Sequence, residues 1–356
     1  MRVPSRPSSS DEATPTDTTT PTDTTVPRAI RIGSRGSKLA LVQAHLVAGR
    51  LGELGIPTEI VLIRTAGDDR APDTAWGEGA FVGAIEAALL DGRIDAAVHS
   101  AKDVPTDQPP GLVIAAWTAR EDPRDALVCR VRGTTLATLP AGARVGTDSP
   151  RRAAFIRAVR PDLVIHPHSG NVDTRLRKLD EGLSDALVLA VAGLTRLGLI
   201  DRIDEILPAD IAIPAPGQGA LALQARSDDT IVREALGRLD DPASRIAVEA
   251  ERAFLDATGG GCRSPIGALG TVSGGRLTLR VAAERDLPLP TRPDALGGIA
   301  RAEGSADAAD AAACRALAAD LAAKVVRWRS RGRVLVTRPS EGARGLADAL
   351  AARGLD

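Results

Sequence analysis

The chain has 356 residues, of which 44% are hydrophobic, and a formal net charge of −1. This length allows two or three domains with their own cores, and the charge excludes a globally basic nucleic-acid-binding protein. Aromatic residues make up only 2%, so the stacking surfaces that bind single-stranded nucleic acids are scarce. The cysteines, Cys129, Cys262 and Cys314, are widely separated and form no CxxC pair. This spacing argues against a disulfide framework or a zinc site and fits the reducing cytoplasm.

Residues 1–27 consist almost entirely of Ser, Thr, Pro and Asp and lack the apolar core of a signal peptide. We expect a disordered tail there. No apolar run approaches the roughly 20 residues that cross a bilayer, which predicts a soluble protein without membrane association.

From Ala29 onward, short apolar runs alternate with longer amphipathic ones. The short runs predict strands at residues 29–32, 58–63, 94–98, 112–116, near 145, 163–165 and 186–190. The longer runs predict helices at residues 37–51, 81–90 and 172–180, and one that Asp148-Ser149-Pro150 opens with an N-cap and a first-turn proline. Alternation of this kind predicts largely parallel sheets.

Two α/β lobes account for this pattern, with the segment 211–226 returning to the first lobe. Beyond it, a helix at 243–257, a strand at 277–282 and an Ala-rich helix at 307–328 predict a smaller α+β domain. The predicted organisation is a tail at 1–27, a first α/β domain at 28–120 and 214–238, a second at 121–213, an α+β domain at 239–330, and a final βα unit at 331–356.

Residues 94–105 change abruptly from apolar to charged. The strand predicted at 94–98 is followed by Lys102 and Asp103, and Pro105 prevents its continuation. The two charges therefore lie at the carboxyl end of a strand, where open α/β sheets bind ligands. Taken alone, the pair is at least as typical of a surface ion pair of little energetic weight.

Several arginines lie at predicted strand ends, helix starts or glycine-flanked turns, namely Arg31, Arg35, Arg151, Arg152, Arg175 and Arg196. The planar guanidinium binds carboxylates and phosphates in bidentate fashion, so this set indicates a ligand with several acidic groups. Singly, each is also consistent with a solvated surface arginine. The segment 146–152 gives the strongest signal, because hydroxyls, helix N-terminal amides and two arginines together form an anion site.

Cys262 follows three glycines and precedes Arg263, which predicts an accessible loop with a cation that favours the thiolate. This position suits covalent chemistry, although a lone cysteine is more often inert. His99, at a strand end, is interpreted as a hydrogen-bonded structural residue rather than a catalyst. We expect no metal site.

Eight segments, taken together in chain order, resemble the hydroxymethylbilane synthase family, also called porphobilinogen deaminase. They are residues 31–37, 98–105, 120–126, 146–152, 170–175, 192–198, 214–219 and 260–262. The resemblance extends over residues 29–330. It implies an α/β fold of two lobes like those of type II periplasmic binding proteins, plus the smaller α+β domain, with the loop of Cys262 projecting between the lobes.

The same resemblance implies a transferase of porphyrin and heme biosynthesis. The family condenses four porphobilinogen molecules into the linear tetrapyrrole hydroxymethylbilane and releases four ammonia molecules. It uses a dipyrromethane cofactor attached to a cysteine through a thioether, and Cys262 matches that cysteine. Each pyrrole carries an acetate and a propionate, so every addition requires fixed cations.

The resemblance also assigns roles to single residues. Asp103 matches the catalytic aspartate, which protonates the leaving aminomethyl nitrogen and then stabilises the cationic azafulvene. Besides Cys262, the positions that match cofactor-binding residues are Lys102, Thr147, Ser149, Arg151, Arg152, Arg175 and Arg196. Those that match substrate-binding residues are Arg31, Arg35, Ser37 and Gln43.

One departure concerns the family's Arg-Gly-Asn, which is Ser169-Gly170-Asn171 here, so a substrate-binding guanidinium is absent. Protonated His166 or His168 would replace it in part, but neutral histidine would not. Two alternatives therefore stay open: a slow or degenerate paralogue, and a two-lobe binding protein for a small anion. A pure binding protein would need neither the cysteine anchor nor a buried acid at Asp103.

The stretch from Arg333 resembles the beginning of uroporphyrinogen-III synthase, the next enzyme of the pathway. This second resemblance implies a fused or associated synthase. Otherwise we expect a cytoplasmic monomer that acts on the small molecule porphobilinogen and has no nucleic-acid or membrane partner.

Overall fold

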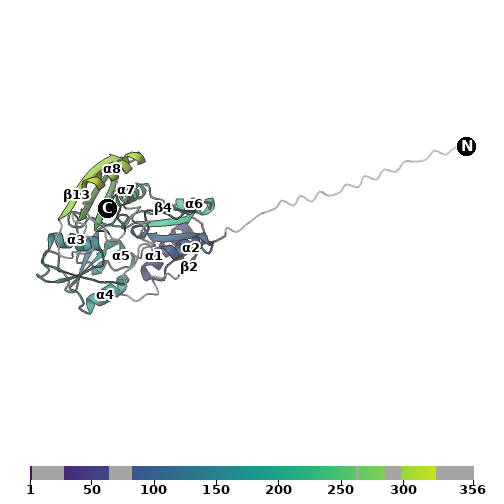
Figure 1. Cartoon of the computed structure of the whole chain (residues 1–356). Coiled ribbons are helices and arrows are strands. Elements are labelled where there is room, and N and C mark those ends of the chain that lie inside the picture. The colour runs from purple at the N-terminus through teal and green to yellow at the C-terminus, as the bar shows by residue number, and fades with distance from the viewer. Residues whose placement is uncertain (2–27, 64–81, 262–263, 285–297, 326–356) are drawn as a thin grey trace, which may run out of the picture.

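The computed structural model describes Met1 and residues 28–63, 82–261, 264–284 and 298–325, which form three sheets with flanking helices (Figure 1). Residues 2–27 of the expected tail, Cys262 and the βα unit expected at 331–356 lie outside these residues. No helix in the described part of the chain is long and apolar enough to cross a membrane.

The first lobe is a five-stranded sheet in the order β2-β1-β3-β10-β4. β1 runs parallel to β2 and β3, whereas β10 is antiparallel to β3 and β4. The strands are β1 (Ile30–Ser34), β2 (Thr58–Leu62), β3 (Ala96–Ser100), β4 (Leu112–Trp117) and β10 (Leu221–Arg226). Helices α1 (Lys38–Glu53), α2 (Gly83–Leu90) and α6 (Thr230–Gly237) pack against this sheet, and a helix of the third region also contacts β4.

The second lobe repeats this arrangement in the order β7-β6-β8-β5-β9. β6 runs parallel to β7 and β8, and β5 is antiparallel to β8 and β9. The strands are β5 (Asp125–Cys129), β6 (Arg144–Gly146), β7 (Val164–His166), β8 (Ala186–Ala190) and β9 (Glu205–Ile206). The helices of this region are α3 (Pro150–Val159), α4 (Val172–Asp180), α5 (Val191–Arg196) and the short 3-10 helix η2 (Ile200–Arg202).

In each sheet the first of three parallel strands lies between the second and the third. The strand through which the chain enters the lobe then lies between the third strand and the edge strand. The expected fold of two similar α/β lobes is therefore confirmed. The expectation of largely parallel sheets is wrong for one strand in each. β5 and β10 are the strands through which the chain enters a lobe from the other one. Such a strand needs no crossover helix, so it is free to run antiparallel to its neighbours.

The third sheet is an antiparallel meander of β11 (Ile266–Ser273), β12 (Arg276–Glu284) and β13 (Ile299–Asp307). Helices α7 (Pro242–Ala257) and α8 (Ala311–Val325) pack on it and on each other. Phe254, Leu279 and Leu321 are fully buried in their shared core. This region is the expected smaller α+β domain.

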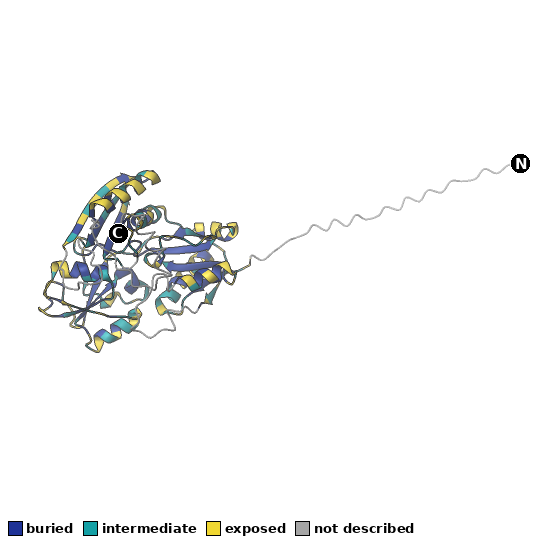
Figure 2. Cartoon of the chain, in the orientation of Figure 1, coloured by how far each residue is buried: buried dark blue, intermediate teal, exposed yellow. Residues whose placement is uncertain are grey.

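The buried residues follow the sheets, and the exposed ones lie on the outer faces of the helices (Figure 2). The third sheet shares a core with the second lobe, because Leu269 and Ala282 lie in one cluster with Phe155 of α3. On the first lobe, Val248 of α7 joins a cluster with Ala101 and Trp117. Helix α7 therefore packs directly behind the end of β3.

Local sequence signals place several elements as expected. Ser149 caps α3 by accepting a hydrogen bond from the Arg152 N–H, and Ser37 caps α1 in the same way from Ala40. The helix expected at 172–180 and the strand expected at 186–190 have those same limits. The strand expected at 94–98 is found at 96–100, so its carboxyl end lies closer to the charged pair.

Candidate active site

Lys102 and Asp103 form the short 3-10 helix η1 (Ala101–Asp103), which directly follows β3. The expected position at a strand's carboxyl end is therefore correct. The Asp103 side chain is exposed, not buried as its expected role suggested. Lys102 Nζ donates to Gln218 Oε1 at 3.2 Å. Burial, followed by the charge of Arg152, lowers the pKa of Lys102 to about 8.

The neighbouring strand end contributes the polar side chains expected from the first lobe. Arg35 follows β1, which lies parallel and adjacent to β3, so it belongs to the same edge of the sheet. Ser37 is used as the N-cap of α1. Gln43, buried on α1, donates through Nε2 to Ser100 Oγ at 3.1 Å. Gln43 thus contacts the residue that immediately precedes η1.

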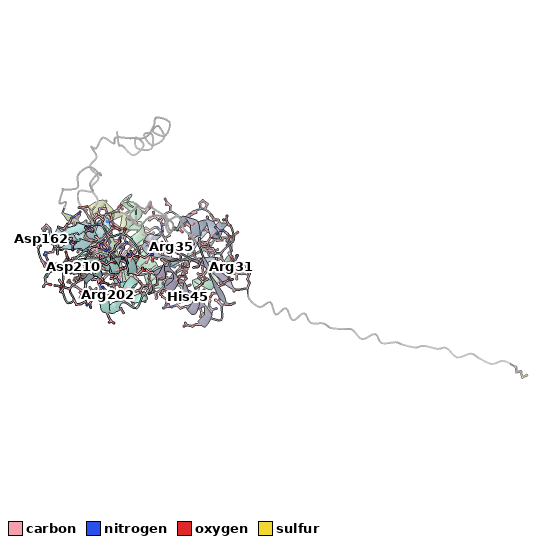
Figure 3. All side chains as sticks on the ribbon, turned by 90° about the horizontal axis from the view of Figure 1, so that it is seen from below. Arg31, Arg35, His45, Asp162, Arg202 and Asp210 are labelled. Carbon is pink, nitrogen blue, oxygen red and sulfur yellow. The ribbon has the colours of Figure 1, made fainter. Side chains whose placement is uncertain are left out.

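Arg31 is not brought to this edge, which corrects its expected place among the substrate-binding residues. Its guanidinium makes a two-pronged contact with Asp95, at 2.9 and 2.7 Å, and also donates to the Gly92 carbonyl. Asp95 precedes β3, so the pair lies at the amino end of the sheet. Figure 3 shows Arg31 farther out on the first lobe than Arg35.

The second lobe contributes the loop before α3. Thr147 Oγ1 accepts a hydrogen bond from the Ser149 N–H at 3.1 Å, and Ser149 Oγ caps the helix. Asp148 accepts a hydrogen bond from the His168 N–H. The two hydroxyls therefore order the loop, and the first-turn amides of α3 lie beside them.

Arg151 and Arg152, on the first turn of α3, are both buried and both paired with Asp125 of β5, at 2.7 and 2.8 Å. Arg151 also donates to the Ile213 carbonyl, and Arg152 to that of Val188. Against the effect of burial, the charges of the two guanidiniums hold the pKa of Asp125 below its usual range. The two arginines are therefore fixed components of the site rather than freely extended side chains.

Gln218 connects the two lobes at this point. Its Nε2 donates to Asp125 Oδ1 at 2.9 Å and to the Pro123 carbonyl at 2.7 Å, while its Oε1 accepts from Lys102. The segment 214–219 is one of those that carry the family resemblance, but Gln218 is not among the site residues expected from the sequence. Because glutamine is uncharged, the charge pattern of the sequence does not indicate this bridging residue.

Arg175 and Arg196 complete the set of cations. Arg175 Nε donates to the Gly170 carbonyl at 2.7 Å, and Arg196 Nη2 to the Gly219 carbonyl at 2.5 Å. Burial lowers the pKa of both, and the charge of Asp103 opposes this at Arg175. Asp103 of the first lobe and Arg175 of the second therefore interact electrostatically.

The segment 166–170 contains Ser169, the position at which the family has an arginine. His168 is buried, and burial lowers its pKa, so it is neutral at pH 7 and does not replace an arginine. Lys178 Nζ, from α4, donates to the Ser169 carbonyl at 3.3 Å. An ammonium therefore contacts the Ser169 backbone, and it comes from a residue to which the sequence alone assigned no role.

Cys262 itself lies outside the described residues, but the chain on both sides of it is fixed. Helix α7 ends at Ala257, and the Gly261 N–H donates to Ser264 Oγ at 3.0 Å. The Ser264 N–H donates back to the Gly261 carbonyl at 2.9 Å. The two residues that flank the 262–263 pair are thus held together.

The cations of the site fit a small polycarboxylate. Burial lowers the pKa of Lys102, Arg151, Arg175 and Arg196 alike, which means that water has been removed from these charges without full replacement by acids. Arg151 Nε is buried and has no hydrogen-bond partner within the described residues. Carboxylates bound here would restore the lost solvation. The described residues contain no group of three or more His, Cys, Asp or Glu side chains that could hold a metal ion.

Two family models match most of the described chain. The model described as "Porphobilinogen deaminase, dipyromethane cofactor binding domain" matches residues 30–234, and that of the porphobilinogen deaminase C-terminal domain matches residues 245–285. The chain belongs to the porphobilinogen deaminase family.

Curated relatives with this name are similar over most of their length. The protein from Roseiflexus sp. strain RS-1 is 53% identical over 254 residues, which cover 70% of this chain and 84% of the relative. That from Sorangium cellulosum is 50% identical over 265 residues, 72% of this chain and 87% of the relative. That from Geobacter sulfurreducens is 50% identical over 255 residues, 70% and 80% of the two chains.

Proposed function

We propose that this porphobilinogen deaminase condenses four porphobilinogen molecules into hydroxymethylbilane and releases four ammonia molecules, as a step of tetrapyrrole and heme biosynthesis. The observation that carries the proposal is one exposed carboxylate, Asp103, at a strand end that Lys102 and Gln218 connect to the buried ion pair of Asp125 and Arg152 in the other lobe. The cations suit the acetate and propionate groups of the substrate. The carboxylate suits the proton and the positive charge of the reaction itself.

The cofactor would be dipyrromethane, joined to Cys262 by a thioether. Lys102, Arg151, Arg152, Arg175 and Arg196 would hold its carboxylates, and Thr147 and Ser149 would order the loop beneath it. When bound, this group supplies the free pyrrole α-carbon on which the chain grows.

Asp103 is assigned two successive tasks. As an acid it donates a proton to the aminomethyl nitrogen of porphobilinogen, so that ammonia leaves. As a carboxylate it then lies beside the cationic pyrrole that remains and accepts a hydrogen bond from the pyrrole N–H. The exposed position of Asp103 agrees with this assignment, because the carboxyl group must reach each incoming substrate.

Arg35 and Gln43 are assigned to the substrate, since Arg35 follows β1 at the sheet edge next to η1 and Gln43, on α1, contacts Ser100 just before η1. Ser37 is placed with them, although its hydroxyl already caps α1. Arg31 is not retained among these residues, because Asp95 and the Gly92 carbonyl occupy its guanidinium.

We place the enzyme in the cytoplasm, supported by the free and buried thiols of Cys129 and Cys314, which a reducing compartment keeps unpaired. The proposed enzyme acts as a monomer. The sequence of residues 331–356 supports a fused or associated uroporphyrinogen-III synthase.

The mass of the intact protein tests the proposal directly. The purified protein should be heavier than its sequence by one dipyrromethane, and incubation with porphobilinogen should add a ladder of pyrrole units. Cys262→Ser should lack the increment, and Asp103→Asn should keep it while turnover falls by orders of magnitude. An unmodified wild-type mass without a ladder would instead favour the anion-binding protein, and a ladder that forms only over hours would favour a slow paralogue.

A further inference from the structure

Helix α7 lies behind the η1 turn and contacts it through side chains that the proposed chemistry does not use. Val248 lies in one buried cluster with Ala101 and Val104, the residues on either side of the charged pair. One turn later along α7, Glu251 and Arg252 extend from the helix toward the same region. The next described residues lead through Gly259–Gly261 toward Cys262.

Arg252 binds the backbone that immediately follows Asp103. Its Nη1 donates to the Val104 carbonyl at 2.7 Å, and its Nη2 to the carbonyls of Pro105 at 2.6 Å and Thr106 at 3.4 Å. The guanidinium also stacks over the ring of Trp117, 5.3 Å from its centroid. One side chain thus donates hydrogen bonds to three successive carbonyl groups and is itself stacked on a buried ring.

The turn needs such support because its own hydrogen bonding is weak. η1 is a single 3-10 turn, and the bond that closes it, from the Val104 N–H to the Ala101 carbonyl, measures 3.4 Å. A 3-10 turn of this length has poor hydrogen-bond geometry and takes its position from its neighbours. The direction of the exposed Asp103 side chain therefore depends on what holds residues 104–106.

The other side of the turn is held by the adjacent residue of α7. Glu251, which is fully buried, accepts a hydrogen bond from the Gly217 N–H at 2.6 Å and makes a two-pronged ion pair with Arg120. Gly217 lies so close that a Cβ there would come within 3.1 Å of the Ala101 backbone. Residues 101–102 and residues 104–106 are therefore fixed by two consecutive side chains of one helix.

We propose that Arg252 is a positioning residue for Asp103. The inference rests on the proposed role of Asp103 as the proton donor. It adds that the arginine acts through the backbone of residues 104–106 and does not touch the substrate. Loss of the guanidinium then lowers the rate of the chemical step and leaves substrate binding nearly intact.

The test compares Arg252→Met, which keeps the length of the side chain, with Arg245→Met on the same helix. Arg245 anchors α7 to β4 through the Ala115 carbonyl and pairs with Asp240 and Glu249, but contacts no part of η1. We expect Arg252→Met to lower kcat at least tenfold with KM changed less than threefold and the cofactor mass intact. Arg245→Met should change kcat less than twofold at a similar loss of thermal stability.

Two further measurements separate positioning from general stability. In an Asp103→Asn background, Arg252→Met should cost little additional activity, because both changes act on the same proton transfer. Arg252→Lys, which reaches fewer of the three carbonyls, should fall between wild type and Arg252→Met. Hydrogen exchange at the amides of Asp103, Val104 and Thr106 should accelerate in the Arg252 variants alone.

Three results would overturn the inference. They are a kcat within twofold of wild type in Arg252→Met, a multiplicative loss in the double variant, and equal exchange at residues 103–106 in both methionine variants. If Arg252→Met does not fold, Arg252→Lys decides by the same measurements. If the wild-type protein has no turnover, the proposed function fails, while the exchange experiment still decides whether Arg252 holds the turn.

Discussion

Lys102 is the cation whose charge depends most on its surroundings. In the structure its ammonium is hydrogen-bonded to Gln218, and burial and the charge of Arg152 lower its pKa to about 8. A ligand carboxylate would favour the charged form and raise the pKa again. Above pH 8, Lys102 is therefore expected to gain a proton when the cofactor is attached, which makes its titration a measure of occupancy.

Acetylation measured against pH checks this expectation at Lys102. In cofactor-free Cys262→Ser protein, Lys102 should be modified with a midpoint near pH 8, as its lowered pKa requires. Peptide mass spectrometry reads Lys102 together with the exposed Lys38 and Lys324 in one sample. In the holoenzyme the Lys102 midpoint should rise. A Lys102 midpoint at the ordinary lysine value of about 10.4 in the cofactor-free protein would contradict the lowered pKa.

Ser169 gives a second prediction at the residue scale. Arginine at this position should bind a substrate carboxylate that Lys178, hydrogen-bonded to the Ser169 carbonyl, does not reach in bidentate fashion. A charge-assisted hydrogen bond contributes about 1.5–3 kcal/mol, so Ser169→Arg should raise kcat/KM roughly tenfold or more. Steady-state kinetics with porphobilinogen measure the change. An unchanged kcat/KM would mean that the surrounding cations already compensate for the serine.

Single residues also show how far sequence alone reaches. Lys102 and Asp103 could be placed because an apolar strand followed by charges and a proline defines a strand end. Arg31 was misplaced because its partner, Asp95, is distant in the chain and is brought to it only by the pairing of β1 with β3. Gln218 was missed because an amide becomes a bridge only when two separate lobes present it with partners.

At the scale of elements, the strand β11 illustrates a packing constraint that sequence does not show. Gly267 of β11 lies against the segment between the lobes, and a Cβ there would come within 2.6 Å of the Ile213 carbonyl oxygen. The obstacle is backbone, which has little room to move. The third sheet and the second lobe are therefore packed at close range where β11 begins.

Gly267→Ala should consequently destabilise the protein by about 1–3 kcal/mol through overpacking. The matched control is Gly49→Ala in the exposed middle of α1, where nothing lies within 4 Å of the added carbon. That change should stabilise the protein by about 0.5–1 kcal/mol, since alanine is the better helix former. Urea unfolding compares both variants with wild type, and an unaffected Gly267→Ala would show that the interface yields easily.

Elements with clear periodicity and caps were predicted from sequence, and those defined by long-range pairing were not. Helices α1 and α3 begin at serine N-caps that the sequence displays. Strands β5 and β13 went unpredicted because β5 is a short run without alternation, and β13 alternates small and charged side chains. Their strand character comes from the neighbours with which they pair.

At the scale of the whole molecule, acid should unfold the protein partly through one histidine. His99 is buried on β3 beside Gln224, and burial lowers its pKa from 6.5 to about 4. Between these values the unfolded chain binds a proton that the folded chain does not, so stability falls as pH decreases from 6.5 to about 4 and is unaffected by His99 above that range. The loss amounts to about 3 kcal/mol.

His99→Gln should remove this part of the pH dependence while the exposed His45→Gln should retain it. The measurement is the free energy of unfolding in urea at several pH values between neutrality and pH 4. Wild type and the His45 variant should lose stability more steeply than the His99 variant over this range. Parallel curves for all three proteins would refute the assignment of the acid sensitivity to His99.

The orientation of the helices that follow the parallel strands affects the electric field of the molecule. Helices α1, α3 and α4 each begin just after the carboxyl end of a parallel strand, at the edge where Asp103 and the cations lie. Each helix adds a positive pole of roughly half an elementary charge at that end. Although the formal net charge of the chain is −1, this edge has a locally positive field that comes from the backbone. The field persists when any one arginine is removed. It attracts carboxylates over the screening distance of about 8 Å at physiological ionic strength.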